Sequence, residues 1–173
     1  MAECSRISAR PELAGLVLLR VYFYDAPPAT GAVKDLWTGE KTNLGQSKVY
    51  GQKTRFLDTL ELQPNVAIRK GELAVHGWKV KGRLLEEIAA SGRAITPADV
   101  VPDIEQKGVD LRIGLDIARL ALKQLVDSIV VVTGDSDMIP AFKFARREGL
   151  RVYLDHLDGP VKRELKAHVD VVL

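Results

Sequence analysis

The sequence predicts an α/β protein with a parallel sheet. In its last third, short apolar runs rich in β-branched residues alternate with amphipathic helical segments. The runs at 16–24 (LVLLRVYFY) and 128–133 (SIVVVT) are typical of strands buried on both faces. Because strands that alternate with helices are joined by right-handed crossovers, this order favours parallel pairing.

Length and composition narrow the function classes. The chain has 173 residues, of which 46% are hydrophobic and 28% charged, so we expect one domain over 1–173. Cys4 is the only cysteine, which excludes an intrachain disulfide and a cysteine-rich zinc site. No apolar run could cross a bilayer and the first ten residues are polar, so we expect a cytoplasmic protein without a membrane partner. The net charge of +2 permits a nucleic-acid partner without requiring one.

The first two thirds of the chain are patterned unevenly. The weakly patterned stretch 82–106 contains Pro97 and Pro102, which argue against a long helix there. We expect, in order, a poorly patterned segment at 1–15, a strand at 16–24, a long loop at 26–47, a helix at 48–62 with Val49, Phe56, Leu57 and Leu60 on one side, a strand at 66–69 and a hairpin or extended segment at 71–81.

The last third is patterned more clearly. A helix at 110–125 is predicted from an apolar stripe, with Asp110 placed as its N-cap. That stripe consists of Leu111, Leu115, Ala118, Leu122 and Leu125. Then follow a strand at 128–133, a tight turn at 134–137, a helix at 138–148 with Pro140 in its first turn, Gly149 after its end, a strand at 150–154, a helix at 160–167 and a strand at 169–173.

Acidic residues gather where function is expected in such folds, beyond the carboxyl ends of the strands. Asp135 and Asp137 follow a predicted strand in the segment T-G-D-S-D, and Asp110 begins the helix that leads into it. Converging carboxylates repel each other by roughly 3 kcal/mol per pair at about 5 Å, a cost that a divalent cation relieves. Hard oxygen ligands suit Mg²⁺ or Mn²⁺. A structural interpretation is also open, in which Asp137 caps the helix and Asp135 holds the turn.

Four further residues are candidates for the same site. Asp116 lies on a largely apolar flank of the predicted helix, either at the edge of its buried face or directed at the site. Asp25 follows the strand at 16–24. Thr133 and Ser136 supply hydroxyls beside the acidic pair, where hydrogen bonds within the turn are the alternative role.

Several of these segments together resemble the NYN domain family, which are PIN-like nucleases and include a LabA-like branch. The resemblance rests on Q-K-G-V-D (106–110), R-I-G-L-D (112–116), V-V-T-G-D-S-D-M-I-P (131–140), R-E-G-L-R-V (147–152) and L-R-V-Y-F-Y-D-A-P-P (19–28). It implies a Rossmann-like, PIN-like three-layer sandwich with a mainly parallel sheet. It also implies a ribonuclease that uses Mg²⁺ or Mn²⁺, with Asp110, Asp135 and Asp137 as metal ligands and Asp116 as a further catalytic acid.

One family feature is missing from the sequence. The family opens with an apolar strand that ends in D-x-x-N, whereas Cys4–Arg10 is polar and cannot form a buried central strand. We therefore expect the usual first strand to be absent, and Asp25 to replace its acid in part. Self-association into a homo-oligomer is one way to fill the gap, because unpaired buried backbone groups are costly.

Two functional hypotheses follow, and a third fits poorly. The first is a metal-dependent ribonuclease whose Lys107, Lys143 and Arg146 hold RNA phosphates at the acidic rim. The second is a catalytically impaired NYN domain that binds RNA or a protein partner as a regulatory module. A phosphatase of the haloacid dehalogenase type also places D-x-D after a strand, but the 36 residues after Asp137 do not supply its other parts.

Overall fold

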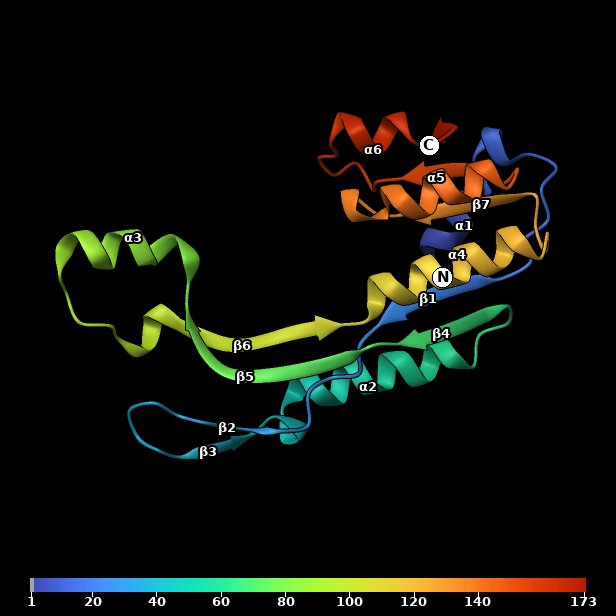
Figure 1. The fold of residues 1–173 in the computed structure, drawn as a ribbon. Coiled ribbons are helices and arrows are strands. Elements are labelled where there is room, and N and C mark those ends of the chain that lie inside the picture. Colours follow the sequence, from blue (N-terminus) through green and yellow to red (C-terminus); the bar gives the residue numbers. More distant parts are fainter. Residues whose placement is uncertain (1) are drawn as a thin grey trace. The chain divides into compact units, whose positions relative to one another are not determined.

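The computed structural model describes residues 2–173 of an α/β protein (Figure 1). The chain divides into two compact units. The first unit contains the residues up to 23, residues 65–67 and residues 110–173, and the second contains residues 24–64 and 68–109. Among the described residues, no helix has the length and apolar character needed to span a membrane.

The first unit contains a parallel sheet in which β8 lies between β7 and β9. These predicted strands and the helices between them are confirmed with small shifts at their ends, although the last strand is shorter than predicted. Their bounds are β7 (Ser128–Val132), η4 (Ser136–Met138), α5 (Ile139–Arg147), β8 (Arg151–Asp155), α6 (Arg163–Ala167) and β9 (Val171–Val172).

The core of the first unit is centred on α5 and β8. Phe142, Val152, Leu154 and Leu165 are its largest fully buried side chains. Gly149 follows the end of α5 as predicted and has a φ of 88°. Because a residue with a Cβ rarely adopts this conformation, the glycine allows the chain to turn from α5 directly into β8.

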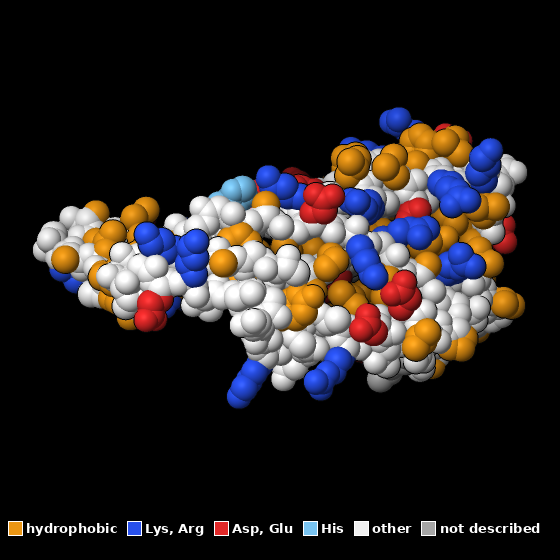
Figure 2. Space-filling model, turned by 90° about the horizontal axis from the view of Figure 1, so that it is seen from below, with side chains coloured by type: hydrophobic (Ala, Val, Ile, Leu, Met, Phe, Trp, Pro, Cys, Tyr) orange, Lys and Arg blue, Asp and Glu red, His pale blue; other side chains and the backbone are white. Residues whose placement is uncertain are grey.

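Helix α4 (Val109–Leu122) confirms the predicted helix, but it buries a different face. Leu111 is 68% exposed and Leu115 is 61% exposed, so the predicted core stripe is wrong. The buried side chains are instead Ile117, Leu120 and Ala121. Apolar residues with helical spacing occupy two adjoining sides of this helix, and spacing alone does not decide which side faces the core. Figure 2 shows hydrophobic side chains exposed among Lys and Arg side chains on one face of the molecule.

The N-terminal part differs from the prediction. The poorly patterned segment forms α1 (Ala2–Ser8) and the short η1 (Pro11–Leu13). The strand predicted at 16–24 is wrong in its first half, because residues 16–19 belong to no helix or strand and Val17 is 92% exposed. An apolar run forms a strand buried on both faces only where neighbouring elements cover it.

The second half of that predicted strand is β1 (Val21–Asp25), which pairs with β4 (Val66–Lys70). The Val21 N–H donates to the Asn65 carbonyl at 2.7 Å, and the Gly71 N–H donates to the Asp25 carbonyl at 2.9 Å. The strands therefore begin together and end together, so they run in the same direction, as the arrows in Figure 1 show.

The described strands form separate small sheets rather than one large one. The sheets are β1–β4, β2–β3, β5–β6 and β7–β8–β9. The predicted α/β class with parallel pairing is confirmed, whereas the described strands do not join into a single, mainly parallel sheet between two helical layers.

The second unit is built on a long antiparallel hairpin of β5 (Glu72–Val80) and β6 (Val100–Lys107). The predicted extended segment at 71–81 is confirmed as β5. The weakly patterned stretch that follows contains a helix, α3 (Gly82–Ser91), which the prediction missed. The loop predicted at 26–47 contains the antiparallel strands β2 (Ala32–Lys34) and β3 (Lys41–Asn43), followed by η2 (Leu44–Gln46).

Helix α2 (Lys48–Glu61) confirms the predicted helix at 48–62. Ser47 caps its N-terminus, because the Ser47 hydroxyl accepts a hydrogen bond from the Tyr50 N–H at 3.1 Å. Of the apolar side predicted for this helix, Leu57 is buried, but Val49 and Phe56 are 68% and 51% exposed. The predicted apolar face is thus only partly a core face.

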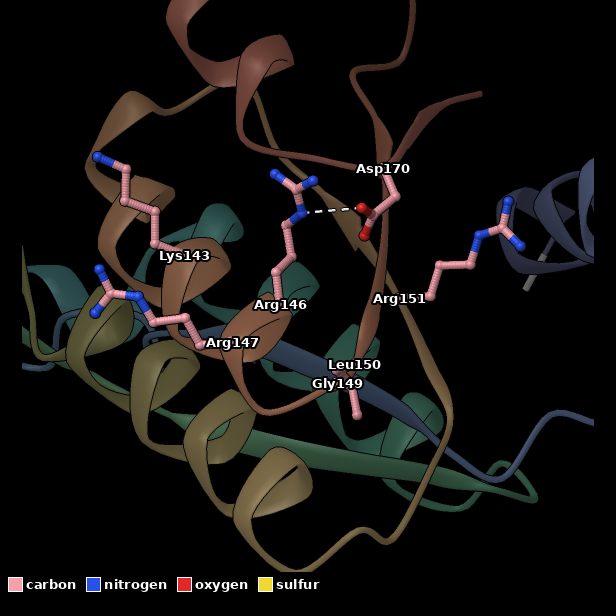
Figure 3. A pocket seen from close by; sticks show the side chains of 7 residues that line it. All are labelled: Lys143, Arg146, Arg147, Gly149, Leu150, Arg151 and Asp170. Atoms are coloured by element: carbon pink, nitrogen blue, oxygen red, sulfur yellow. Dashed lines mark hydrogen bonds and ion pairs between the residues drawn. The ribbon is translucent and has the colours of Figure 1, made fainter.

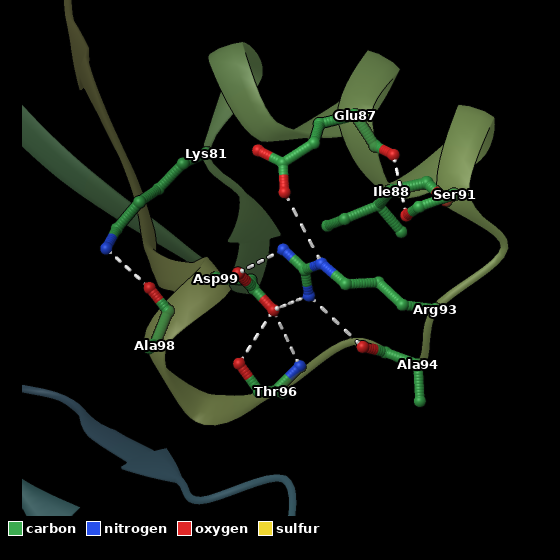
Figure 4. A network of polar contacts seen from close by, with 9 residues as sticks. All are labelled: Lys81, Glu87, Ile88, Ser91, Arg93, Ala94, Thr96, Ala98 and Asp99. Carbon is green, nitrogen blue, oxygen red and sulfur yellow. Dashed lines mark hydrogen bonds and ion pairs between the residues drawn. The ribbon is translucent and has the colours of Figure 1, made fainter.

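A polar network closes the far end of the hairpin, where α3 leads through η3 (Pro97–Asp99) into β6 (Figure 4). Arg93 donates to both carboxylate oxygens of Asp99, at 2.8 and 3.0 Å. The Thr96 N–H and hydroxyl also donate to Asp99, at 2.8 and 2.7 Å. Arg93 first and Thr96 second hold the pKa of Asp99 far below its ordinary value.

Candidate functional site

The turn after β7 carries the predicted acidic pair. Asp135 is the N-cap of η4, and its Oδ1 accepts a hydrogen bond from the Asp137 N–H at 2.9 Å. The cap is therefore Asp135, and the interpretation in which Asp137 caps the helix is wrong. Thr133 Oγ1 accepts from the Asp135 N–H at 3.0 Å, which is the turn hydrogen bond considered for it. Ser136 is half-buried at the start of η4.

Both acids of this turn are exposed. The Asp137 carboxylate makes no hydrogen bond or ion pair with any described residue, and the Asp135 carboxylate makes only its cap bond. The two side chains thus retain oxygens that could bind a cation or accept protons from a ligand.

Asp110 lies in the first turn of α4 and is not the N-cap, because the helix already begins at Val109. Its side chain is exposed, and it has no ion pair among the described residues. Helix α4 and strand β7 run in opposite directions (Figure 1), so the first turn of α4 and the carboxyl end of β7 lie at the same end of the first unit. Asp116 is half-buried further along α4 and already has an interaction partner.

The three predicted metal ligands are not gathered into a metal-binding cluster. Among residues 2–173, no group of three or more His, Cys, Asp or Glu side chains is arranged to hold a metal ion. Asp135 and Asp137 come from one turn, and Asp110 shares only their end of the unit. The donor chemistry suits a hard cation, whereas the full three-acid set is not assembled.

Arg6, a residue that the sequence analysis missed, places its guanidinium group at this edge of the sheet. Asp155, the last residue of β8, is 2% exposed, and its Oδ2 accepts a hydrogen bond from Arg6 Nη2 on α1 at 2.6 Å. The Asp155 carbonyl accepts from the Thr133 N–H at 3.1 Å, which joins this residue to the acidic turn. Hydrogen bonds to Glu3 first, and then to Asp155, raise the pKa of Arg6. The only signal in the sequence was indirect, since an acid that ends a buried strand requires a partner.

Asp25 belongs to the second unit, where it is the last residue of β1. Its Oδ1 accepts hydrogen bonds from the Ala26 N–H at 2.8 Å and from Lys53 Nζ at 2.9 Å. The carboxylate therefore has a local structural role at the end of its strand, and its proposed part as a replacement acid has no support from these contacts.

The basic residues suggested as phosphate ligands have different surroundings. Lys107, in the second unit, pairs with Glu105 at 3.3 Å, and Arg146 pairs with Asp170 at 2.9 Å. Lys143 is exposed and has no ion pair with a described residue. Since α5 starts beyond the carboxyl end of β7 and ends before the amino end of β8, Arg146 lies at the edge of the sheet opposite the acidic turn. Its predicted place at the acidic rim is wrong.

A pocket of about 730 Å³ opens at that opposite edge (Figure 3). It is lined by Lys143, Arg146, Arg147, Gly149, Leu150, Arg151 and Asp170. Figure 3 shows side chains from the last turns of α5 and from the first residue of β8 around it, with the Arg146–Asp170 ion pair between them. The first unit thus has an acidic turn at one edge of its sheet and a basic pocket at the other.

Comparison with known proteins supports the resemblance seen in the sequence. Residues 54–172 match the model of the NYN domain, and this segment contains Asp110, Asp116, Asp135 and Asp137. The comparison with curated proteins found no match, and the comparison with solved structures found none either. Because the matched segment covers more than half of the sequence, the chain belongs to the NYN domain family.

Proposed function

We propose that this chain is a ribonuclease that depends on Mg²⁺ or Mn²⁺ and hydrolyses RNA phosphodiester bonds. The observation that carries the proposal is the pair Asp135 and Asp137, exposed on the turn after β7 and inside the segment that matches the NYN family. The carboxyl end of a parallel strand is where α/β folds place their sites. The family's Rossmann-like three-layer sandwich would be the scaffold of this activity.

The acidic turn fits a hard divalent cation in part. Mg²⁺ is commonly held by one or two carboxylates, and water and substrate phosphates complete its shell. Asp135 and Asp137 could provide such a pair, with Asp110 as a third ligand and Asp116 as a further catalytic acid, although the described residues form no three-acid group. When bound, the ion would supply a water activated for attack on phosphorus.

The test is a cleavage time course with labelled single-stranded and hairpin RNA in Mn²⁺, beside an EDTA control. Asp135→Asn is the decisive variant, because asparagine keeps the N-cap bond of η4 and removes the charge. The matched control is Asp127→Asn, which removes an exposed acid just before β7, at the other edge of the sheet. We expect products from the wild type and the control, and none from Asp135→Asn or in EDTA. Equal cleavage by Asp135→Asn would remove the acidic turn from the proposal.

A second candidate function is an RNA- or partner-binding regulatory module without cleavage. Two observations favour it: the described residues hold no three-acid group, and Arg6 already neutralises Asp155 at the same edge of the sheet. This function predicts that RNA remains bound in EDTA and that no product forms under any metal condition. Metal-dependent products from the wild type would reject it.

A further inference from the structure

The basic pocket at the end of α5 has a charge that its surroundings do not neutralise. Of its lining residues, four are cationic and one is acidic, which leaves a formal charge of +3 (four minus one). Arg146 is neutralised by Asp170, whose other oxygen accepts a hydrogen bond from the Val152 N–H at 2.8 Å. This pair therefore has a structural role, because it ties α5 to the start of β8.

The other three cations have no such role. Lys143, Arg147 and Arg151 are exposed, and none forms an ion pair or hydrogen bond through its side chain with a described residue. Arg151 lies over the ring of Tyr153, with its guanidinium carbon 5.4 Å from the ring centroid. This aromatic contact limits where the Arg151 head group lies without reducing its charge.

The helix dipole accounts for only part of this arrangement. Cations in the last turn of a helix are stabilised by its partial negative charge, which suffices to explain Arg146 and Arg147. It does not explain Arg151, which is on a strand, or Lys143, which precedes the last turn of α5. Several uncompensated cations around one hollow favour an anionic ligand, and guanidinium groups match the geometry of phosphate oxygens.

We propose that Lys143, Arg147 and Arg151 form a phosphate-binding site for the backbone of single-stranded RNA, at the edge of the sheet away from the acidic turn. The choice of RNA rests on the proposed function. The five residues of β8 separate the two edges by about 16 Å. One RNA strand of several nucleotides therefore spans the distance between the pocket and the acidic turn.

The experiment measures RNA binding by fluorescence anisotropy in EDTA, with a labelled single-stranded RNA of about a dozen nucleotides. The test variant combines Lys143→Gln, Arg147→Gln and Arg151→Gln, and leaves the Arg146–Asp170 pair intact. The matched control combines Lys34→Gln, Lys41→Gln and Lys48→Gln, three exposed cations of the second unit without ion pairs to described residues. Thermal melting establishes that both variants fold.

We expect the test variant to bind RNA at least about tenfold more weakly. The negative slope of log affinity against log salt should become less steep by about 2, since three phosphate contacts are lost. The control variant should lose less RNA affinity than the test variant, and its salt slope should change less. Equal losses in the two variants, or no loss in the test variant, would overturn the proposal.

A second arm separates RNA from small phosphate compounds, with tripolyphosphate as the probe. If the test variant loses affinity for tripolyphosphate but keeps that for RNA, the RNA assignment is wrong. The result is also independent of catalysis: a wild type that cuts nothing, but whose RNA binding depends on these three residues, would reject the nuclease and support the pocket.

Discussion

Arg6 and Asp155 are 149 residues apart in the sequence, and Arg6 Nη2 lies 2.6 Å from Asp155 Oδ2. The Asp155 side chain is 3% exposed, whereas that of Arg6 is 39% exposed. The carboxylate is therefore removed from water, and it depends on Arg6 and on the Leu157 N–H, which donates to its Oδ1 at 2.8 Å. A buried charge that loses its partner is strongly destabilising.

Arg6→Gln should lower the melting temperature of the protein, because it leaves Asp155 buried without its counter-charge. Glu3→Gln is the control, since it removes the other acid that pairs with Arg6 but leaves the buried carboxylate paired. We expect a clear decrease for Arg6→Gln and little change for the control. The double variant Arg6→Gln/Asp155→Asn should recover part of the loss, and an additive double variant would contradict the coupling.

The Arg93–Asp99 network should make stability fall in acid. The pKa of Asp99 is lowered in the folded protein, so its contribution is fully present above its ordinary pKa and is lost as the pH falls below about 4. Asp99→Asn should lower the melting temperature near neutral pH. In acid, the difference in melting temperature between this variant and the wild type should become smaller. Thermal melting across this pH range checks it, with the exposed Asp58→Asn as the control. A constant difference at every pH would contradict the prediction.

The two sides of α4 should respond differently to truncation. Ile117→Ala removes a buried side chain and should cost roughly 2–5 kcal/mol. Leu115→Ala lies two residues away on the same helix and is 61% exposed, so its effect should stay within about 1 kcal/mol. Urea unfolding of the two variants measures both values. A loss of unfolding free energy well above about 1 kcal/mol for Leu115→Ala would mean that a partner covers this side of the helix.

Metal binding at the acidic turn should raise the melting temperature without any RNA. A ligand at a hundred times its Kd stabilises the folded state by about 2.7 kcal/mol. Mn²⁺ titration should therefore shift the wild type and Asp127→Asn upward, and shift Asp137→Asn much less. Equal shifts in all three proteins would place the bound ion elsewhere.

The sequence predicted best where local signals determine the structure. Pro140 near the start of a helix and Gly149 after its end carry their own conformational preferences, and α5 and β8 lie close to where these residues indicated. The acidic turn was predicted for the same reason, because a strand, a glycine and two acids specify a turn within a few residues.

The errors concern decisions that depend on distant parts of the chain. Residues 16–19 have the composition of a buried strand, but burial requires neighbours that the run itself does not encode. Arg6 stands in a polar segment without periodicity, and its importance follows only from Asp155. Whether Asp110 joins Asp135 and Asp137 is likewise a question of tertiary placement, which residue spacing does not answer.

The strand pair β1–β4 and the Arg6–Asp155 contact have a practical consequence for domain boundaries. Both β1 and Arg6 precede residue 54, where the NYN match begins. A fragment cut to the matched segment would expose one side of β4 and leave the buried Asp155 carboxylate without its counter-charge. Family boundaries therefore make a poor guide for excising this domain, and a protease that trims the N-terminus would loosen the sheet edge beside the acidic turn.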